Sequence, residues 1–299
     1  MGELKLLRRS LAALSDELHQ QGHSVCPTTV ARLLEAEGFA LHVNIKRFTG
    51  PAHPDRDRQF CYLQEQLDRF QAQGWPIISV DAKKKELLGN FKNSGATWGR
   101  AAAEVNCHDF RSDAVGRAAP YGIYDLGANR GHVCVGLSAD TPAFAVASIR
   151  EWWVRLGCKR YGAMPELLIL ADAGGSNGCR PRLWKKELQD FADRYGLRIT
   201  VGHYPTGASK WNPIEHRLFG PISINWAGEP LRSVERMVGF IQGTTTASGL
   251  VVSAGVDRRE YPTKVKVPDA EMEGLNLFRH EVCPQWNYTI KPRYMVSRN

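Results

Sequence analysis

The stretch LLILADAGGSNG, residues 167–178, runs five apolar residues directly into an aspartate and a glycine-rich loop. An apolar run of this length that ends in a turn is typical of a β-strand buried in a sheet. Asp172 follows the run, and burial of its carboxylate is unfavourable unless another group compensates the charge. The fold and the function of the chain therefore depend on which other residues meet Asp172.

The composition indicates a globular protein with an anionic partner. The 299 residues are 43% hydrophobic and 23% charged, enough for one large domain or two modest ones. The formal net charge of +8 favours nucleic acid as a partner first and an acidic membrane surface second. No apolar run approaches the roughly 18–20 residues of a membrane span, so we expect no membrane partner.

The seven cysteines argue for a reducing compartment. They are scattered, odd in number and never spaced as C-x-x-C, which argues against a disulfide framework and against the usual zinc motifs. The first twenty residues mix charges of both signs with leucines, as in an amphipathic helix and unlike a signal peptide. We therefore expect a cytoplasmic protein.

Two helices are predicted at the N-terminus, over residues 3–21 and 28–39. Leucines recur at helical spacing in the first helix, and the segment GHSVCP breaks it. Thr28 is the predicted N-cap of the second helix. The inner face of that helix is predicted to consist of Val30, Leu33 and Leu34.

A short glycine-containing turn joins these helices, which is typical of a helix-turn-helix motif. In that motif Thr28, Thr29 and Arg32, at the start of the second helix, would face DNA. An ordinary helical hairpin would give the same pattern, so the sequence leaves both interpretations open.

Strands and helices alternate along the rest of the chain. Residues 48–59 are polar and proline-rich and predict a linker, and a helix is predicted over 60–74. The later segments predict, in order, a strand in 75–85, a hairpin in 121–138, a helix over 141–157, a strand in 166–173, a helix over 180–196, a strand in 197–205, a helix from 212 and a helix over 231–249. This order predicts a mixed α/β sheet with helices packed on it. Residues 251–299 are polar and irregular, with a further strand or a tail in 281–296.

Two acids follow short apolar strands: Asp81 after PIISV and Asp172 after LLILA. If these strands are neighbours in one sheet, the two carboxylates lie side by side and repel each other unless a cation sits between them. Hard oxygen ligands of this kind suit Mg²⁺. Glu215, in SKWNPIEHRLFG, is a third candidate. Asn212, Pro213 and Glu215 also fit a helix N-cap, a first-turn proline and a capping box.

Other polar segments have simpler interpretations. Asp125 fits a turn acid in the predicted hairpin. The segment DAGGSNG lacks the glycine order of the known phosphate-binding loops, so Ser176 and Asn177 are expected to support the turn. The residues His203, His216 and Arg217 are expected on the surface or in packing.

Basic residues flank two of the three acids. Four lysines come after Asp81, namely Lys83, Lys84, Lys85 and Lys92. Such a run is usually a solvated face, but beside a metal site it would also attract phosphates. Lys210 and Trp211 precede Glu215 and pair a cation with a ring that can stack on an unpaired or distorted DNA strand.

Six segments are informative together: SVDAKKKELLGNFKNSG, NCHDF, PYGIYDLGANRGHVCVG, LILADAGGSNG, WNPIEHRLFGPISINWAGEPL and WNYTIKPR. They resemble the Rhodopirellula-type insertion-sequence transposases, which carry a DDE catalytic domain. The resemblance covers the chain from about residue 20 onward. It implies an RNase H-like fold of the retroviral integrase superfamily.

The same resemblance implies that Asp81, Asp172 and Glu215 are the catalytic acids and the ligands of Mg²⁺ or Mn²⁺. The implied reaction is two-metal-ion cleavage of DNA strands, followed by their transfer to target DNA. The implied partners are double-stranded DNA, at the element ends and at the target, and further copies of the chain in a homo-oligomer on DNA. A bacterial, nucleoid-associated protein of the cytoplasm is expected.

The expected domain organisation has four parts: a helix-turn-helix-like DNA-binding region at 1–47, a linker and connecting helix at 48–74, an RNase H-like catalytic domain at 75–250 and a C-terminal extension at 251–299. Relatives commonly have Thr at the position of Ala82. They usually begin with a further helix-turn-helix region, so we expect a chain truncated at its N-terminus, with compromised activity. A remnant that only binds DNA and a stand-alone RNase H-like nuclease are the alternative functions.

Overall fold

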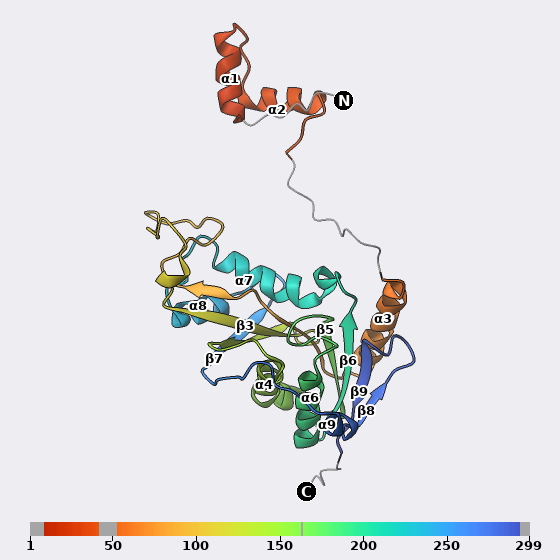
Figure 1. Ribbon diagram of the computed structural model, residues 1–299. Helices are drawn as coiled ribbons and strands as arrows, with labels where there is room; N and C mark the ends of the chain where they lie inside the picture. The colour runs from red at the N-terminus through yellow and green to blue at the C-terminus, as the bar shows by residue number, and fades with distance from the viewer. Residues whose placement is uncertain (1–8, 42–52, 163, 294–299) are drawn as a thin grey trace. The chain divides into compact units, whose positions relative to one another are not determined.

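The computed structural model describes residues 9–41, 53–162 and 164–293, and the chain forms two compact units, Met1–Pro51 and Ala52–Asn299 (Figure 1). The first unit contains the N-terminal helices and the second contains the whole β-sheet. In the described part of the chain, no helix has the length and hydropathy needed to cross a bilayer.

The first unit is a pair of helices, α1 (Leu11–Gln20) and α2 (Pro27–Ala36). The predicted cap at Thr28 is wrong, because α2 already begins at Pro27, which lacks the N–H that the first helical turn would leave without a partner. Val30 is buried as predicted, whereas the side chain of Leu33 is 52% exposed. Among the described residues of this unit, α1 packs on α2.

A nine-stranded sheet forms the centre of the second unit. Its strands are β1 (Ile77–Ala82), β2 (Glu86–Leu88), β3 (Gly116–Asp125), β4 (Arg130–Gly136), β5 (Glu166–Asp172), β6 (Arg198–Tyr204), β7 (Val251–Asp257), β8 (Leu277–Arg279) and β9 (Asn287–Ile290). Their spatial order is β7-β4-β3-β1-β5-β6-β9-β8, and β2 pairs with β3.

Strand directions identify the class of fold. Strands β4, β3 and β1 are antiparallel neighbours, and β5 and β6 then continue parallel to β1. An antiparallel three-strand meander extended by two parallel strands confirms the predicted mixed sheet and the RNase H-like fold. Residues 251–290, which the sequence pattern left irregular, contribute β7 beside β4 and the pair β9 and β8 beside β6.

Helices cover both faces of this sheet (Figure 1). One face packs against α4 (Pro142–Trp152) and α6 (Arg182–Tyr195). The other face packs against α3 (Arg56–Ala72), the segment 213–219, and the helices α7 (Gly220–Asn225) and α8 (Val234–Gln242). Two short helices, α5 (Cys158–Tyr161) and α9 (Asp269–Glu273), complete the described unit.

Local signals in the sequence set several helix ends correctly. Thr141 caps α4 by accepting a hydrogen bond from the backbone N–H of Phe144, and α6 ends at Gly196 with a φ of 63°. The linker predicted over 48–59 is too long, because α3 begins at Arg56. Its residue Gln59 is fully buried and donates a hydrogen bond to the carbonyl of His203, so this turn is fixed to β6.

Two glycines of the β3–β4 hairpin let the segment 213–219 approach the sheet closely. A Cβ atom on Gly122 would lie 2.5 Å from the ring of Phe219 and 2.9 Å from Ile214. A Cβ atom on Gly131 would lie 2.4 Å from Leu218. Ile214, Leu218 and Phe219 are all buried, so no side chain at either glycine could be accommodated without moving them.

We expect Gly122→Ala to lower the free energy of unfolding by about 1–3 kcal/mol, because the added methyl group overpacks two buried side chains. Urea denaturation measures this change. Gly239→Ala is the matched control, since a methyl group added at Gly239 in α8 would meet no atom of another element within 4 Å, and the same substitution there favours the helix. Equal stability of the two variants would contradict the packing argument.

Candidate active site

Asp81 and Asp172 lie at the ends of neighbouring strands. β1 and β5 run parallel, with Val80 beside Ala171, so the two aspartates follow at the same edge of the sheet. Neighbouring strands are about 4.8 Å apart. The prediction that these two strands are adjacent is therefore confirmed. The backbone N–H of Ala82 donates a hydrogen bond of 2.8 Å to Asp81 Oδ1.

Asn212 connects both strands to the third acid. Its Nδ2 donates to Asp172 Oδ1 at 3.0 Å and to the carbonyl of Val80 at 3.4 Å. Its Oδ1 accepts a hydrogen bond from Ser79 Oγ, and Ser79 Oγ accepts one from the backbone N–H of Ile214 at 3.0 Å. Asn212 is fully buried, so these contacts fix the start of the helical segment that carries Glu215.

The capping-box interpretation of Asn212 and Glu215 is wrong about the side chain of Asn212. The Asn212 side chain is fully engaged with Ser79, Val80 and Asp172, and Ser79 of β1 supplies the acceptor for the first turn instead. Glu215 begins a single π-helical turn, Glu215–Phe219, between Asn212 and α7. Turns of this kind are rare and frequently occur at functional sites.

The electrostatics of the site follow from burial and like charge. Burial and the Asp172 carboxylate raise the pKa of Asp81 to about 8, and Glu215 and Asp140 add to this effect. Burial also raises the pKa of Asp172, against the hydrogen bond from Asn212 that favours its charged form. The acids are thus close enough to interact, and their combined negative charge is uncompensated.

The three carboxylates do not form a closed ligand set. Among the residues that the structure describes, the one group of three possible metal ligands with all donor atoms within 4.8 Å of one another is His132, Cys134 and Glu151. Folding therefore brings Asp81, Asp172 and Glu215 to one region, but their carboxylate oxygens do not all lie within 4.8 Å of one another. Mutual repulsion of uncompensated carboxylates favours this separation.

Sequence reasoning missed Asp140, which adds a fourth acid to this region. Asp140 raises the pKa of Asp81, and its buried Oδ1 has no hydrogen-bond partner. The hydroxyl of Tyr121 on β3 is also buried without a partner, in the same negative field. The sequence did not single out Asp140, because a polar residue directly before a helix N-cap is ordinary.

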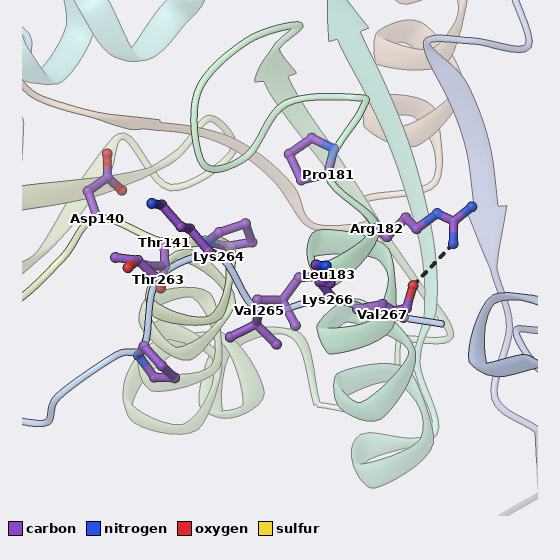
Figure 2. Close-up of a pocket in the computed structure, with 12 residues that line it drawn as sticks. Asp140, Thr141, Pro181, Arg182, Leu183, Thr263, Lys264, Val265, Lys266 and Val267 are labelled. Atoms are coloured by element: carbon purple, nitrogen blue, oxygen red, sulfur yellow. Dashed lines mark hydrogen bonds between the residues drawn. The ribbon is translucent and has the colours of Figure 1, made fainter. Parts of the chain in front are cut away.

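A pocket of about 590 Å³ lies between the starts of α4 and α6 and the segment 262–267 (Figure 2). Asp140 lies at one side of the pocket and Lys264 beside it, and the hydrogen bond from Arg182 to the carbonyl of Val267 lies at the opposite side. The pocket is therefore lined by Asp140 and by basic side chains.

The loop after Asp172 also contains polar groups without partners. Ser176 Oγ and both polar atoms of Asn177 are buried and make no hydrogen bond. The loop curls back on itself through the bond from Cys179 N–H to the carbonyl of Ala173. We expected Ser176 and Asn177 to stabilise the turn with their side chains. Instead, these side chains make no hydrogen bond to the described residues of the turn.

Behind Asp172, a chain of hydrogen bonds crosses the sheet. Trp184 Nε1 donates to Tyr288 Oη, Tyr288 Oη donates to His203 Nε2, and His203 Nδ1 donates to the carbonyl oxygen of Asp172. Burial lowers the pKa of His203 to about 4, which keeps this imidazole neutral. His203 is thus a packing residue, as expected.

The other predicted contact residues occupy varied surroundings. Lys83 is half-buried, with Nζ bonded to Ser223 Oγ at 2.8 Å and 5.2 Å from the Trp226 ring, and burial lowers its pKa. The lysines at 84, 85, 92 and 210 are exposed. Trp211 is 54% exposed, and Lys210 Nζ lies 5.3 Å above its ring.

Three smaller predictions concern surface groups. His216 and Arg217 are exposed, as expected, and His216 Nε2 donates to the carbonyl of Lys210. In the first unit, Thr28 and Arg32 are exposed and Thr29 is half-buried, with Oγ1 3.2 Å from Cys26 Sγ. These residues lie along the first turns of α2.

Comparison with known proteins identifies the family. The sequence profile of the Rhodopirellula transposase DDE domain matches residues 1–292. This chain belongs to the Rhodopirellula transposase DDE-domain family. The resemblance stated from the sequence is thereby confirmed. No curated protein matches the chain at a significant level.

Solved structures similar to this family member include complexes of the Mos1 transposase. The Mos1 paired-end complex with the left transposon end has a TM-score of 0.48 and 15% identity, covering 81% of this chain and 73% of that chain. The Mos1 mariner paired end complex with Mn has a TM-score of 0.48 and 15% identity, covering 80% and 72%. The Mos1 strand transfer complex has a TM-score of 0.44 and 14% identity, covering 76% and 63%.

The raised pKa of Asp81 predicts a pH dependence of stability without divalent cations. The folded state keeps the Asp81 proton up to about pH 8, whereas an unfolded chain releases it near pH 4, so the free energy of unfolding falls as pH rises through this range. The slope is at most about 1.4 kcal/mol per pH unit. Asp81→Asn should remove this contribution in urea denaturation with EDTA.

The exposed Asp109 provides the control, because Asp109→Asn changes the same functional group and Asp109 is not among the charges that raise the pKa of Asp81. It should keep the wild-type pH dependence. The assignment of the slope to Asp81 fails if the Asp81→Asn protein loses stability between pH 4 and 8 as the wild type does.

Proposed function

We propose that this chain is a DDE transposase that cuts DNA at the ends of an insertion sequence and joins the cut strand to target DNA. One observation carries the proposal: Asp81 and Asp172 end adjacent parallel strands, and buried Asn212 bonds to both strand ends just before Glu215. Membership of a transposase family agrees with this chemistry.

The donor set at this sheet edge fits divalent cations. Asp81, Asp172 and Glu215 offer the hard oxygen ligands that Mg²⁺ or Mn²⁺ prefers. The raised pKa of Asp81 means that its charged form is unfavourable beside the other acids, and a cation bound here would favour that form and could also accept the buried Asp140 Oδ1 as a partner. When bound, a pair of such ions supplies activation of the attacking oxygen and stabilisation of the leaving 3′ oxygen.

The chain's own residues orient the acids for an in-line displacement. Asn212 holds Asp172 through one carboxylate oxygen and leaves the other free, and the Ala82 N–H does the same for Asp81. In the first step a water oxygen attacks the phosphorus at the element end, the bond from phosphorus to the 3′ oxygen breaks and a 3′-OH is freed. In the second step that hydroxyl attacks a target phosphorus and displaces another 3′ oxygen. No covalent bond to the protein is needed.

DNA contacts are proposed on both units. The exposed lysines at 84, 85 and 92 would bind phosphates, and Lys210 with Trp211 would hold a distorted strand near Glu215. Lys83 would instead stabilise the charge of Glu215 from its fixed position beside Ser223. Thr28, Thr29 and Arg32 would face the major groove.

We also propose the fourfold domain organisation: DNA recognition by 1–47, connection by 48–74, catalysis by 75–250, and an extension at 251–299 that completes the sheet. The substrates are double-stranded element ends and target DNA. The active form is a homo-oligomer assembled on DNA in the nucleoid.

Asp172→Asn should abolish Mg²⁺-dependent nicking of supercoiled plasmid and joining of a 3′-OH oligonucleotide to that plasmid, because the site loses an essential anionic ligand. The folded structure and salt-dependent DNA binding should persist. Gel analysis of nicked and joined products with Mg²⁺ or Mn²⁺ measures both steps, and Asp109→Asn should behave as the wild type.

The outcomes separate the alternatives. Binding without nicking by the wild type would indicate a remnant that only binds DNA. Nicking without joining would indicate a stand-alone nuclease. Full activity of Asp172→Asn would overturn the proposed site.

Metal binding can also be measured without the reaction. Mg²⁺ at about 100 times its dissociation constant should stabilise the wild type by about 2.7 kcal/mol and should not stabilise the variant with both Asp81→Asn and Asp172→Asn. Thermal unfolding with and without Mg²⁺ tests this difference. Equal Mg²⁺ effects on both proteins would place the ion elsewhere.

A further inference from the structure

A second group of metal-binding side chains lies between β4 and α4. His132 and Cys134 are two residues apart on β4, so their side chains point to the same face of the strand. Glu151 approaches them from α4. His132 Nε2 lies 3.5 Å from Cys134 Sγ and 3.8 Å from Glu151 Oε1, and Cys134 Sγ lies 3.4 Å from Glu151 Oε2.

These separations are close to those around a tetrahedral zinc ion. With bonds of about 2.3 Å to sulfur and about 2.0–2.2 Å to nitrogen and oxygen, a tetrahedral ion holds its sulfur and nitrogen ligands roughly 3.5 Å apart. Sulfur and oxygen ligands have the same spacing, and nitrogen and oxygen ligands are roughly 3.4 Å apart. The two distances from Cys134 Sγ, to His132 Nε2 and to Glu151 Oε2, agree with these values, and one donor atom from each of the three residues lies within 4.8 Å of the other two.

The surrounding hydrogen bonds orient the ligands for a metal ion. Ser253 Oγ on β7 lies 3.3 Å from the carbonyl oxygen of Gly131, to which it can donate its proton, and 2.8 Å from His132 Nδ1, from which it can then accept a hydrogen bond. This arrangement places the imidazole proton on Nδ1 and leaves Nε2, which lies near Cys134 and Glu151, with a free lone pair. Metal-binding histidines are typically held in this way by their second ring nitrogen.

We propose that His132, Cys134 and Glu151 bind one Zn²⁺ ion. Imidazole, thiolate and carboxylate together suit zinc, whereas Mg²⁺ prefers the all-oxygen set of Asp81, Asp172 and Glu215. Binding requires the thiolate, so the proton of Cys134 passes to solvent when the ion enters.

Access is available from the side of Glu151. His132 and Cys134 are 2% and 1% exposed, so they face little water. The Glu151 side chain is 21% exposed and lines a surface pocket together with Arg155 and Asp257. Arg155 Nε bonds to Glu151 Oε1 at 2.9 Å, which leaves Oε2 for the ion. A water molecule from the pocket would complete four ligands.

The proposed ion would stabilise the fold and would take no part in the proposed reaction. The ion would join β4 to α4 directly and to β7 through Ser253, and so would tie β7 to the antiparallel half of the sheet. Neither the acids of the candidate active site nor DNA contributes to it.

Cobalt substitution in the full chain tests the proposal independently of transposition. The background carries Asp81→Asn and Asp172→Asn, so that ions at the acids are not counted. Anaerobic titration with Co²⁺ should give a thiolate-to-cobalt charge-transfer band and visible bands of a tetrahedral ion, and one equivalent of Zn²⁺ should remove both. Zn²⁺ should also raise the melting temperature, and EDTA should reverse the rise.

Three variants assign the ligands. Cys134→Ser should remove the charge-transfer band, and Cys158→Ser should keep it, because Cys158 lies on α5 and bonds to the carbonyl of Val154. Glu151→Gln preserves side-chain size and should weaken Co²⁺ binding by roughly tenfold or more while the thiolate band persists. Circular dichroism checks that each variant folds.

The proposal is overturned if the parent protein gives no cobalt band, because the three groups are then only a hydrogen-bonded cluster in which the thiol donates to Glu151. A band that survives in Cys134→Ser also overturns it. Either result leaves the proposed transposase site untouched, since that site is already disabled in the background protein.

Discussion

The side-chain amide of Asn212 is the interaction on which the candidate active site depends. It is buried, its Oδ1 accepts a hydrogen bond from Ser79 of β1, and its Nδ2 donates both to Val80 at the end of β1 and to Asp172 at the end of β5. Because a buried amide is costly when any partner is lost, these hydrogen bonds hold the start of the segment that carries Glu215 against the ends of β1 and β5. Gly122 and Gly131 allow the same segment to pack closely on the sheet, because they leave room for Phe219 and Leu218.

The strands that hold the acids could be predicted from local sequence because their signals are local. Apolar runs before Asp81 and Asp172, the cap and proline at the start of α4 and the glycine at the end of α6 each report on a few neighbouring residues. The adjacency of the two acid strands was an expectation of the metal-site hypothesis and not of a local signal, and the register of β1 and β5 agrees with it.

Features that depend on distant residues could not be predicted in this way. The start of α3 is fixed by contacts of Gln59 with β6 and β9, more than a hundred residues later in the chain. Asp140 gains its importance only because folding leaves its Oδ1 buried near Asp81. The strands β8 and β9 have only three and four residues, and pairing with each other and with β6 stabilises them. Strand β7 has seven residues, and its place in the sheet depends on pairing with the distant β4.

The hydrogen bonds from Trp184 through Tyr288 and His203 to Asp172 have a consequence for synthesis of the chain. Tyr288 belongs to the last strand of the sheet, whereas Asp172 emerges from the ribosome more than a hundred residues earlier. Until β9 has left the exit tunnel and paired with β6, His203 has no partner for Nε2 and the backbone behind Asp172 is unsupported. A nascent chain therefore carries all three acids before β9 can support the backbone behind Asp172.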